Sequence, residues 1–195
     1  MADAFVNTED AALQQLHRSL EKQTLADLVK ARTSRPLLLV DCSGSMSERI
    51  ATGQRKIEAL RQVVKTLRET HPVAVAAFGL GGSSTYEHVA LVDTIPEPSG
   101  GTPMHAAIDF AKGHGATHIV LVTDGLPDSQ TQTFEAARQF GGRIDVFYVG
   151  DGQDEGAGFC KALAQMTGGA SDVTDLGEQK KLATKIAGCL PEGRA

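Results

Sequence analysis

Five oxygen-bearing side chains in three separate stretches of the chain have the chemistry to bind a hard divalent cation together. Asp41, Ser43 and Ser45 lie in LVDCSGSM, Thr102 lies in GGTP, and Asp124 lies in VTDG. Mg²⁺ prefers six oxygen ligands in an octahedral array and gives up water reluctantly. Two carboxylates and three neutral hydroxyls supply little negative charge, so such a site keeps a position for water or for a carboxylate from outside. The residues predict a site for Mg²⁺, Mn²⁺ or Ca²⁺.

The elements around these residues are expected to place them at one edge of a sheet. Residues 36–41 and 119–123 are apolar runs that end in polar loops, as strands buried on both faces of a parallel sheet do. Thr102 directly precedes a segment with apolar residues at helical spacing, from Met104 to Ala111. In such sheets ligands bind beyond the carboxyl ends of the strands, where the strand order reverses. Asp41 and Asp124 would be neighbours if their strands flank that reversal.

The rest of the chain alternates between strand-like and helix-like segments. Further strands are expected at 73–78 and 144–149, with a short antiparallel edge strand at 87–93 and a last strand from 173. Helices are expected at 57–67, 129–140, 159–166 and 176–190. This alternation predicts an α/β fold with a doubly wound, mostly parallel sheet, one antiparallel edge strand and helices on both faces.

The first part of the chain, residues 1–35, does not follow this alternation. Thr8 is a predicted N-cap ahead of a helix with Leu13, Leu16 and Leu20 on one face, and Thr24 is a predicted cap of a second short helix. We therefore expect a helical extension at 1–35 and a second domain at 36–195. The extension would either pack onto that domain or serve as a docking arm for a partner.

Composition narrows the class of protein. The net charge is −5, which argues against a nucleic-acid surface and an anionic membrane surface. No apolar run reaches the length of about 20 residues that a membrane span needs, and the N-terminal sequence lacks the pattern of a signal peptide. The three cysteines, Cys42, Cys160 and Cys189, are odd in number and widely spaced. Reduced thiols in a cytoplasmic protein fit this pattern.

The order and spacing of these motifs resemble the von Willebrand factor A (VWA) domain family. The segments VDCSGSM, SGGTPM, IVLVTDG and FYVGDG carry the resemblance, which extends over about 36–190. It implies a Rossmann-like fold and an intact metal-ion-dependent adhesion site of the compact intracellular bacterial type. Ser43, Ser45 and Thr102 would offer hydroxyls to the metal, while Asp41 and Asp124 would bind it directly or through water. A protein partner would supply an Asp or Glu carboxylate to the metal.

The resemblance also implies a class of function without enzymatic activity. Bacterial members often act beside AAA+ ATPases as adaptors or assembly subunits, and a stress-response scaffold of the tellurite-resistance type is the alternative. In some relatives, partner binding shifts the last helix, here 176–190. No residue in the chain selects among these partners.

An enzymatic function is the alternative to protein binding. Asp41 and Asp124 would suit a Mg²⁺-dependent hydrolase or phosphotransferase, but the chain lacks a Gly-x-x-x-x-Gly-Lys-Ser/Thr phosphate loop. Ser43 as a nucleophile would need a base, and His105 is the nearest in sequence, although it is expected to be a surface residue. Between the metal-site residues, Cys42 is expected to point into apolar packing, with a redox-sensitive thiol as the alternative.

Overall fold

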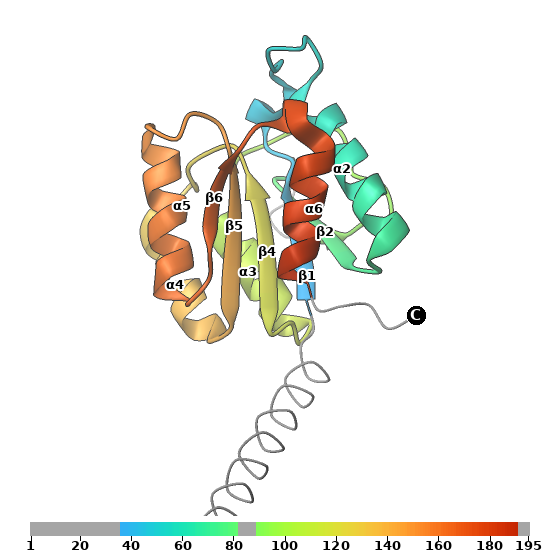
Figure 1. Ribbon diagram of the computed structural model, residues 1–195. Coiled ribbons are helices and arrows are strands. Elements are labelled where there is room, and N and C mark those ends of the chain that lie inside the picture. Colours follow the sequence, from blue (N-terminus) through green and yellow to red (C-terminus); the bar gives the residue numbers. More distant parts are fainter. Residues whose placement is uncertain (1–35, 82–88, 191–195) are drawn as a thin grey trace, which may run out of the picture. The chain divides into compact units, whose positions relative to one another are not determined.

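A computed structural model describes residues 36–81 and 89–190 (Figure 1), so the helices expected at 1–35 lie outside the described residues. The described part contains one six-stranded sheet with the order β3-β2-β1-β4-β5-β6. All neighbouring strands pair in parallel except β3, which is antiparallel to β2. The strands are β1 (Pro36–Asp41), β2 (Ala74–Phe78), β3 (Val89–Leu91), β4 (His118–Thr123), β5 (Arg143–Val149) and β6 (Ser171–Thr174).

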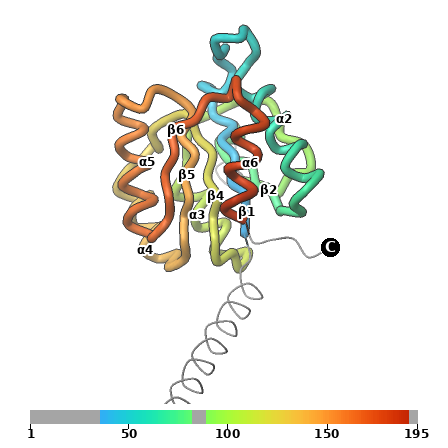
Figure 2. Tube along the Cα trace, in the orientation of Figure 1, coloured from blue at the N-terminus to red at the C-terminus, as the bar shows by residue number. Residues whose placement is uncertain are grey.

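Helices cover both faces of the sheet, and the Cα trace shows the resulting three layers (Figure 2). One face carries α2 (Lys56–Thr70) and α6 (Gln179–Cys189), which pack against each other. The other face carries α3 (Met104–Gly113), α4 (Gln130–Phe140) and α5 (Glu155–Met166). Two short 3₁₀ turns, η1 (Gly44–Ser47) and η2 (Leu176–Glu178), precede α2 and α6. None of the helices in the described part is long and apolar enough to cross a membrane.

The alternation of side chains along β1 explains why both faces of the sheet are covered. Leu38 and Val40 pack into the core beneath α2 and α6, whereas Leu37 and Leu39 pack into the core beneath α3, α4 and α5. All four side chains are buried. A strand between two helical layers must be apolar on both sides, which accounts for the continuous apolar run in the sequence.

The structure confirms the expected fold class and adjusts the element boundaries. The antiparallel edge strand is shorter than expected, covering only Val89–Leu91 among the described residues. The last strand begins at Ser171 rather than at Val173. Its early start follows from pairing with β5, where Ser171 lies beside Val146. A polar residue at a sheet edge gives no apolar signal in the sequence.

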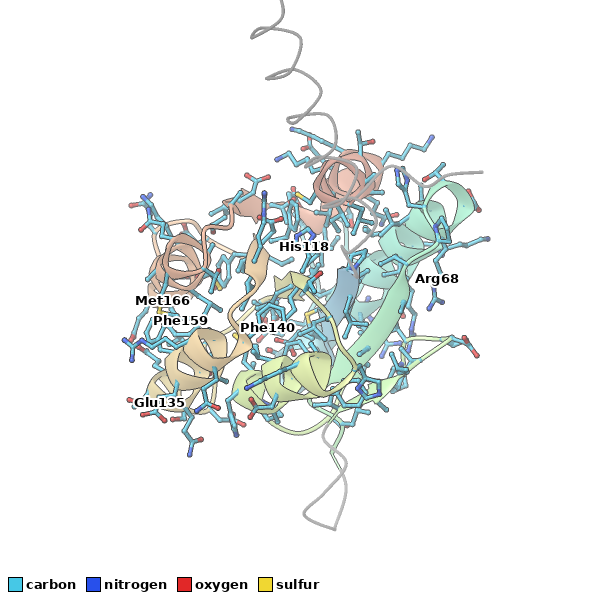
Figure 3. All side chains as sticks on the ribbon, turned by 90° about the horizontal axis from the view of Figure 1, so that it is seen from below. Arg68, His118, Glu135, Phe140, Phe159 and Met166 are labelled. Atoms are coloured by element: carbon cyan, nitrogen blue, oxygen red, sulfur yellow. The ribbon has the colours of Figure 1, made fainter. Side chains whose placement is uncertain are left out.

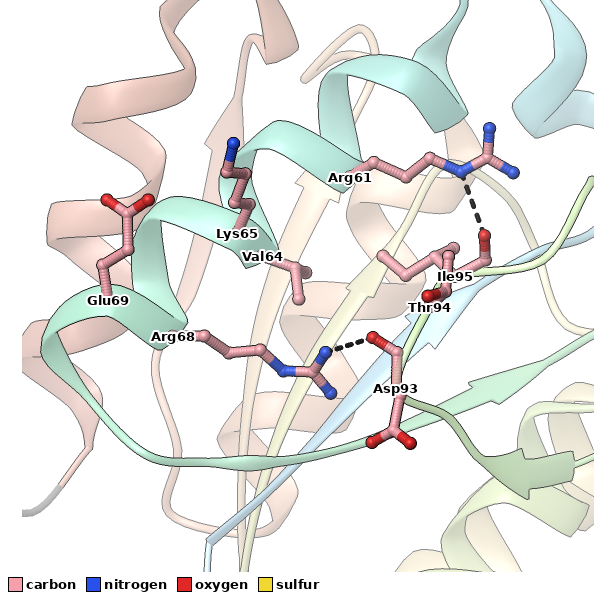
Figure 4. Close-up of a pocket in the computed structure, with 8 residues that line it drawn as sticks. All are labelled: Arg61, Val64, Lys65, Arg68, Glu69, Asp93, Thr94 and Ile95. Atoms are coloured by element: carbon pink, nitrogen blue, oxygen red, sulfur yellow. Dashed lines mark hydrogen bonds between the residues drawn. The ribbon is translucent and has the colours of Figure 1, made fainter.

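The chain segment after β3 is held against α2 by two arginines (Figure 4). The Arg61 side chain donates hydrogen bonds to the backbone carbonyls of Ile95 and Pro96. Two turns further along α2, Arg68 donates to the backbone carbonyls of Val92 and Asp93. These contacts border an open pocket of about 500 Å³ between α2 and the segment. They fix the start of the loop that leads to Thr102.

A buried ion cluster lies where β4 and β5 begin, at the end of the sheet seen in Figure 3. The Asp145 side chain is only 1% exposed, and its Oδ2 lies 2.7 Å from Nε2 of His118. The Arg143 guanidinium also binds this carboxylate, at 2.9 Å. The backbone N–H of Ala170 donates to Oδ1 at 2.7 Å. Asp145 thereby ties β4, β5 and the turn before β6 together.

Replacing this carboxylate should destabilise the domain. We expect Asp145→Asn to lower the free energy of unfolding by about 2 kcal/mol, because the buried His118 ring and the Ala170 N–H lose a charged hydrogen-bond acceptor. Asp172→Asn is the control, since Asp172 pairs with Lys185 in a more exposed position, and should cost less than about 1 kcal/mol. Urea unfolding monitored by circular dichroism measures both, and equal losses would contradict this role of Asp145.

The same carboxylate predicts a dependence of stability on acid pH. Burial by itself would raise the pKa of Asp145, but hydrogen bonds from His118, Arg143 and Ala170 outweigh burial and lower it to about 2. The unfolded-state pKa is about 4, so the stabilisation is complete above that pH and is lost as the pH falls through about 2. The difference in unfolding free energy between wild type and Asp145→Asn should therefore shrink below about pH 4. A difference that widens there would show the opposite sign of linkage.

Candidate metal centre

The predicted site begins with a buried carboxylate at the end of β1. Strands β1 and β4 are neighbours and flank the point where the strand order reverses, which meets the condition for Asp41 and Asp124 to lie close together. Asp41 is fully buried there. Its Oδ1 accepts a hydrogen bond from the backbone N–H of Ser43 at 2.8 Å, and its Oδ2 accepts one from the Thr123 hydroxyl at 2.6 Å. Asp41 thus holds the loop after β1 against the end of β4.

Asp41 has no cationic side chain among these partners. Burial raises its pKa to about 6, because the loss of water outweighs the hydrogen bonds from Thr123 and Ser43, and the nearby Asp124 raises it further. A cation at this position would favour the ionised form and reverse that balance. The electrostatics of the carboxylate therefore fit a cation site.

Two serine hydroxyls continue from Asp41 towards Asp124. The Oγ atoms of Ser43 and Ser45 lie 3.1 Å apart, and the Ser45 hydroxyl donates to Oδ1 of Asp124 at 2.7 Å. Ligands bound to Mg²⁺ at its usual distances lie about 2.9 Å apart along the edges of an octahedron. The oxygens of Ser43, Ser45 and Asp124 already have such spacings, so this donor set fits a small hard cation.

The Thr102 loop is joined to the first loop by backbone hydrogen bonds. The N–H of Gly44 donates to the carbonyl of Gly100 at 3.1 Å, and the N–H of Ser99 donates to the carbonyl of Cys42 at 2.7 Å. Thr102 itself is buried, and its backbone N–H donates to Oδ1 of Asp128 at 2.8 Å. The structure thus brings all three predicted stretches together, although they are far apart in the sequence.

Gly79 allows this close approach of the two loops. It has a φ of 82°, which favours glycine, and a Cβ atom there would lie 2.7 Å from the Ser43 nitrogen and 2.8 Å from the Gly101 carbonyl oxygen. Any larger residue would push apart the loops that carry Ser43 and Thr102.

Sequence reasoning missed Lys56, the first residue of α2. Its ammonium Nζ lies 2.7 Å from Oδ2 of Asp124 and 2.7 Å from Oε2 of Glu48. A signal was available, because a cation at a helix N-terminus opposes the helix dipole and needs compensating anions. Two further residues were missed, Thr123 and Asp128. The pairing of β1 with β4 predicts the first, since it places Thr123 beside Asp41.

The structure also locates the two residues named in the alternative interpretations. Cys42 is fully buried in the apolar core, as predicted, and burial raises the pKa of its thiol to about 12. His105 is half-buried rather than a surface residue. Its Nδ1 is buried without a hydrogen-bond partner in the described part of the chain. His105 is partly covered because it lies in the first turn of α3, next to the buried Met104.

Neither 36–81 nor 89–190 contributes a cluster of three or more His, Cys, Asp or Glu side chains that could hold a metal. The candidate centre therefore depends on its hydroxyls, which suits Mg²⁺ or Mn²⁺ better than the softer zinc.

Comparison with known families agrees with this arrangement. The sequence profile described as "von Willebrand factor type A domain" matches residues 35–173, a range that includes all the predicted ligands. The chain belongs to this family. VWA domains commonly act as protein-interaction modules, and many bind a divalent metal ion at the metal-ion-dependent adhesion site. No curated protein matches this VWA chain in sequence.

Solved structures agree with the fold. The von Willebrand factor type A protein from Catenulispora acidiphila superposes with a TM-score of 0.57 at 19% identity, over 80% of this chain and 41% of that one. Proximal thread matrix protein 1 from the mussel byssus superposes with a TM-score of 0.54 at 15% identity, over 78% of this chain and 44% of that one. The chain thus spans less than half the length of either protein. At these identities the likeness establishes the fold alone.

A substitution at Gly79 should disturb the centre selectively. We expect Gly79→Ala to lower the free energy of unfolding by about 2 kcal/mol and to weaken Mn²⁺ binding at least about tenfold, since it displaces the loops of Ser43 and Gly101. Gly113→Ala is the control, because a Cβ there meets nothing within 4 Å, and its stability should stay within about 1 kcal/mol of wild type. Urea unfolding and Mn²⁺ titration by electron paramagnetic resonance measure both. Unchanged Mn²⁺ affinity in Gly79→Ala would contradict the packing argument.

Proposed function

We propose that this VWA domain is a metal-dependent protein-interaction module without enzymatic activity. One observation carries the proposal: the Ser45 hydroxyl lies 2.7 Å from Oδ1 of Asp124 and 3.1 Å from Oγ of Ser43, with the buried Asp41 carboxylate anchoring the same loop. Ser45 and Asp124 are separated by 79 positions in the sequence. Such a convergence of hydroxyls and carboxylates is a ligand set for Mg²⁺, with Mn²⁺ or Ca²⁺ as substitutes.

Each residue has a role in this proposal. Ser43, Ser45 and Thr102 offer neutral hydroxyls, so the bound ion keeps most of its positive charge. Asp124 supplies a carboxylate. Asp41 orients the loop that carries Ser43 by accepting a hydrogen bond from the Ser43 N–H. The cation, when bound, supplies a Lewis-acidic position that accepts an Asp or Glu carboxylate of a partner protein. The interaction is therefore lost on chelation.

The partner follows from this chemistry as an acidic protein surface. We propose that the chain serves as an adaptor or assembly subunit in the cytoplasm of a bacterial cell, with an AAA+ ATPase as the class of partner that the family resemblance favours. A stress-response scaffold would use the same site, and the two functions differ in the protein that is bound.

Metal-dependent capture tests this function. Extract passed over the immobilised chain with Mg²⁺ should yield a partner that EDTA releases and that Asp124→Ala does not retain. Asp109→Ala, at an exposed position on α3, is the control and should retain the partner. In parallel, Asp124→Ala should bind Mn²⁺ at least about tenfold more weakly than wild type. Retention that ignores both EDTA and Asp124→Ala would place the binding surface elsewhere and overturn the proposal.

A further inference from the structure

The candidate centre contains a cation of its own, the ammonium of Lys56. The Asp124 side chain is 0% exposed, and its two oxygens have different partners. Oδ1 accepts from the Ser45 hydroxyl, whereas Oδ2 lies 2.7 Å from Nζ of Lys56. The Lys56 side chain is only 16% exposed, so solvent screens this pair weakly. The ammonium thus neutralises a carboxylate that belongs to the metal site.

Lys56 is fixed in this position by more than its charge. Its backbone N–H donates to the carbonyl of Glu48 at 2.9 Å, and the Glu48 N–H donates to the carbonyl of Ser45 at 3.0 Å. The Glu48 carboxylate, which is 65% exposed, binds the ammonium from the solvent side at 2.7 Å. The loop that carries Ser45 therefore holds both the backbone and the side chain of Lys56 next to Asp124.

A lysine at this place is unfavourable for α2 itself. The N-terminus of a helix carries partial positive charge and favours Asp or Glu over Lys in the first turn. The presence of a lysine here is therefore explained by its contacts with the site residues and not by the stability of the helix. The exposed Lys65 lies on the same helix and makes no such contact with the site residues.

We propose that Lys56 is a resident counter-cation of the metal site: it competes with the divalent ion for Asp124, and it makes the loaded site one charge more positive than a neutral residue would. This inference rests on the proposed function and deepens it. Without metal, the carboxylates of Asp41, Asp124 and Glu48 together with the Lys56 ammonium leave two negative charges, one fewer than the site would have with a neutral residue in place of Lys56. With the ion bound, these groups and the ion sum to zero, whereas a neutral residue in place of Lys56 would leave one negative charge, so the lysine favours an anionic partner. Lys56 thus lowers the affinity of the site for the metal ion and raises the attraction of the loaded site for a partner's carboxylate.

Charge-removing variants of Lys56 test the inference with Mn²⁺ as the probe. Lys56→Met and Lys56→Gln should both bind Mn²⁺ about tenfold more tightly than wild type, because a positive charge next to the ion is gone. Lys56→Gln keeps a hydrogen-bond donor for Asp124, so the loop stays in place even if Lys56→Met folds poorly. Lys56→Arg keeps the charge and should remain within about threefold of wild type. Lys65→Met, which removes a charge elsewhere on α2, should also leave the affinity unchanged.

The readouts separate this inference from the function on which it rests. Mn²⁺ affinity is measured by electron paramagnetic resonance on the full chain, and thermal unfolding with and without Mn²⁺ gives an independent value through the shift in Tm. Tighter binding in both neutral variants and not in Lys56→Arg supports the inference. Weaker or equal binding in Lys56→Gln overturns it and makes Lys56 a purely structural residue. If wild type itself does not bind Mn²⁺, the proposed function fails as well.

Discussion

The fully buried carboxylate of Asp41 is the constraint on which the candidate metal centre depends. It lies where β1 ends beside β4, out of reach of water, and it must find hydrogen-bond donors within the protein. The Ser43 N–H and the Thr123 hydroxyl are those donors. By accepting both bonds, Asp41 fixes the turn of the first loop and joins two strands. The positions of Ser43 and Ser45 follow from this junction.

The sheet contains a second buried aspartate, Asp145, whose hydrogen-bond partners and pKa differ from those of Asp41. Asp145, at the opposite end of the strands, is compensated by His118 and Arg143, and its pKa falls to about 2. Within 36–81 and 89–190, Asp41 has hydroxyl and amide donors and no cationic side chain as a hydrogen-bond partner, and its pKa rises to about 6. Burial raises the pKa of both carboxyls, but at Asp145 the hydrogen bonds from His118, Arg143 and Ala170 outweigh it. This contrast supports the proposed cation site beside Asp41.

The cation that the site does contain is beside Asp124 rather than Asp41. Lys56 neutralises the Asp124 carboxylate, whereas it does not pair with the Asp41 carboxylate. The neutralisation of Asp124 by Lys56 lowers the negative charge of the candidate centre, which supports the proposal that a coordination position is left for a partner. The two loops that complete the centre meet across Gly79, where no side chain larger than hydrogen fits between them.

The sequence by itself determined the fold class, the apolar strands and the set of ligand residue types, because these depend on local periodicity and on motifs within a few residues. The resemblance to the VWA family came from the same short segments. The extent of the edge strands could not be predicted, since pairing with a neighbour decides where a polar strand begins, as at Ser171. Only the tertiary structure decided the partners of the site. Lys56 meets Asp124 across 68 positions, and Thr123 meets Asp41 across 82. Local sequence patterns cannot predict such contacts, because the strand order β2-β1-β4 and the packing of α2 create them.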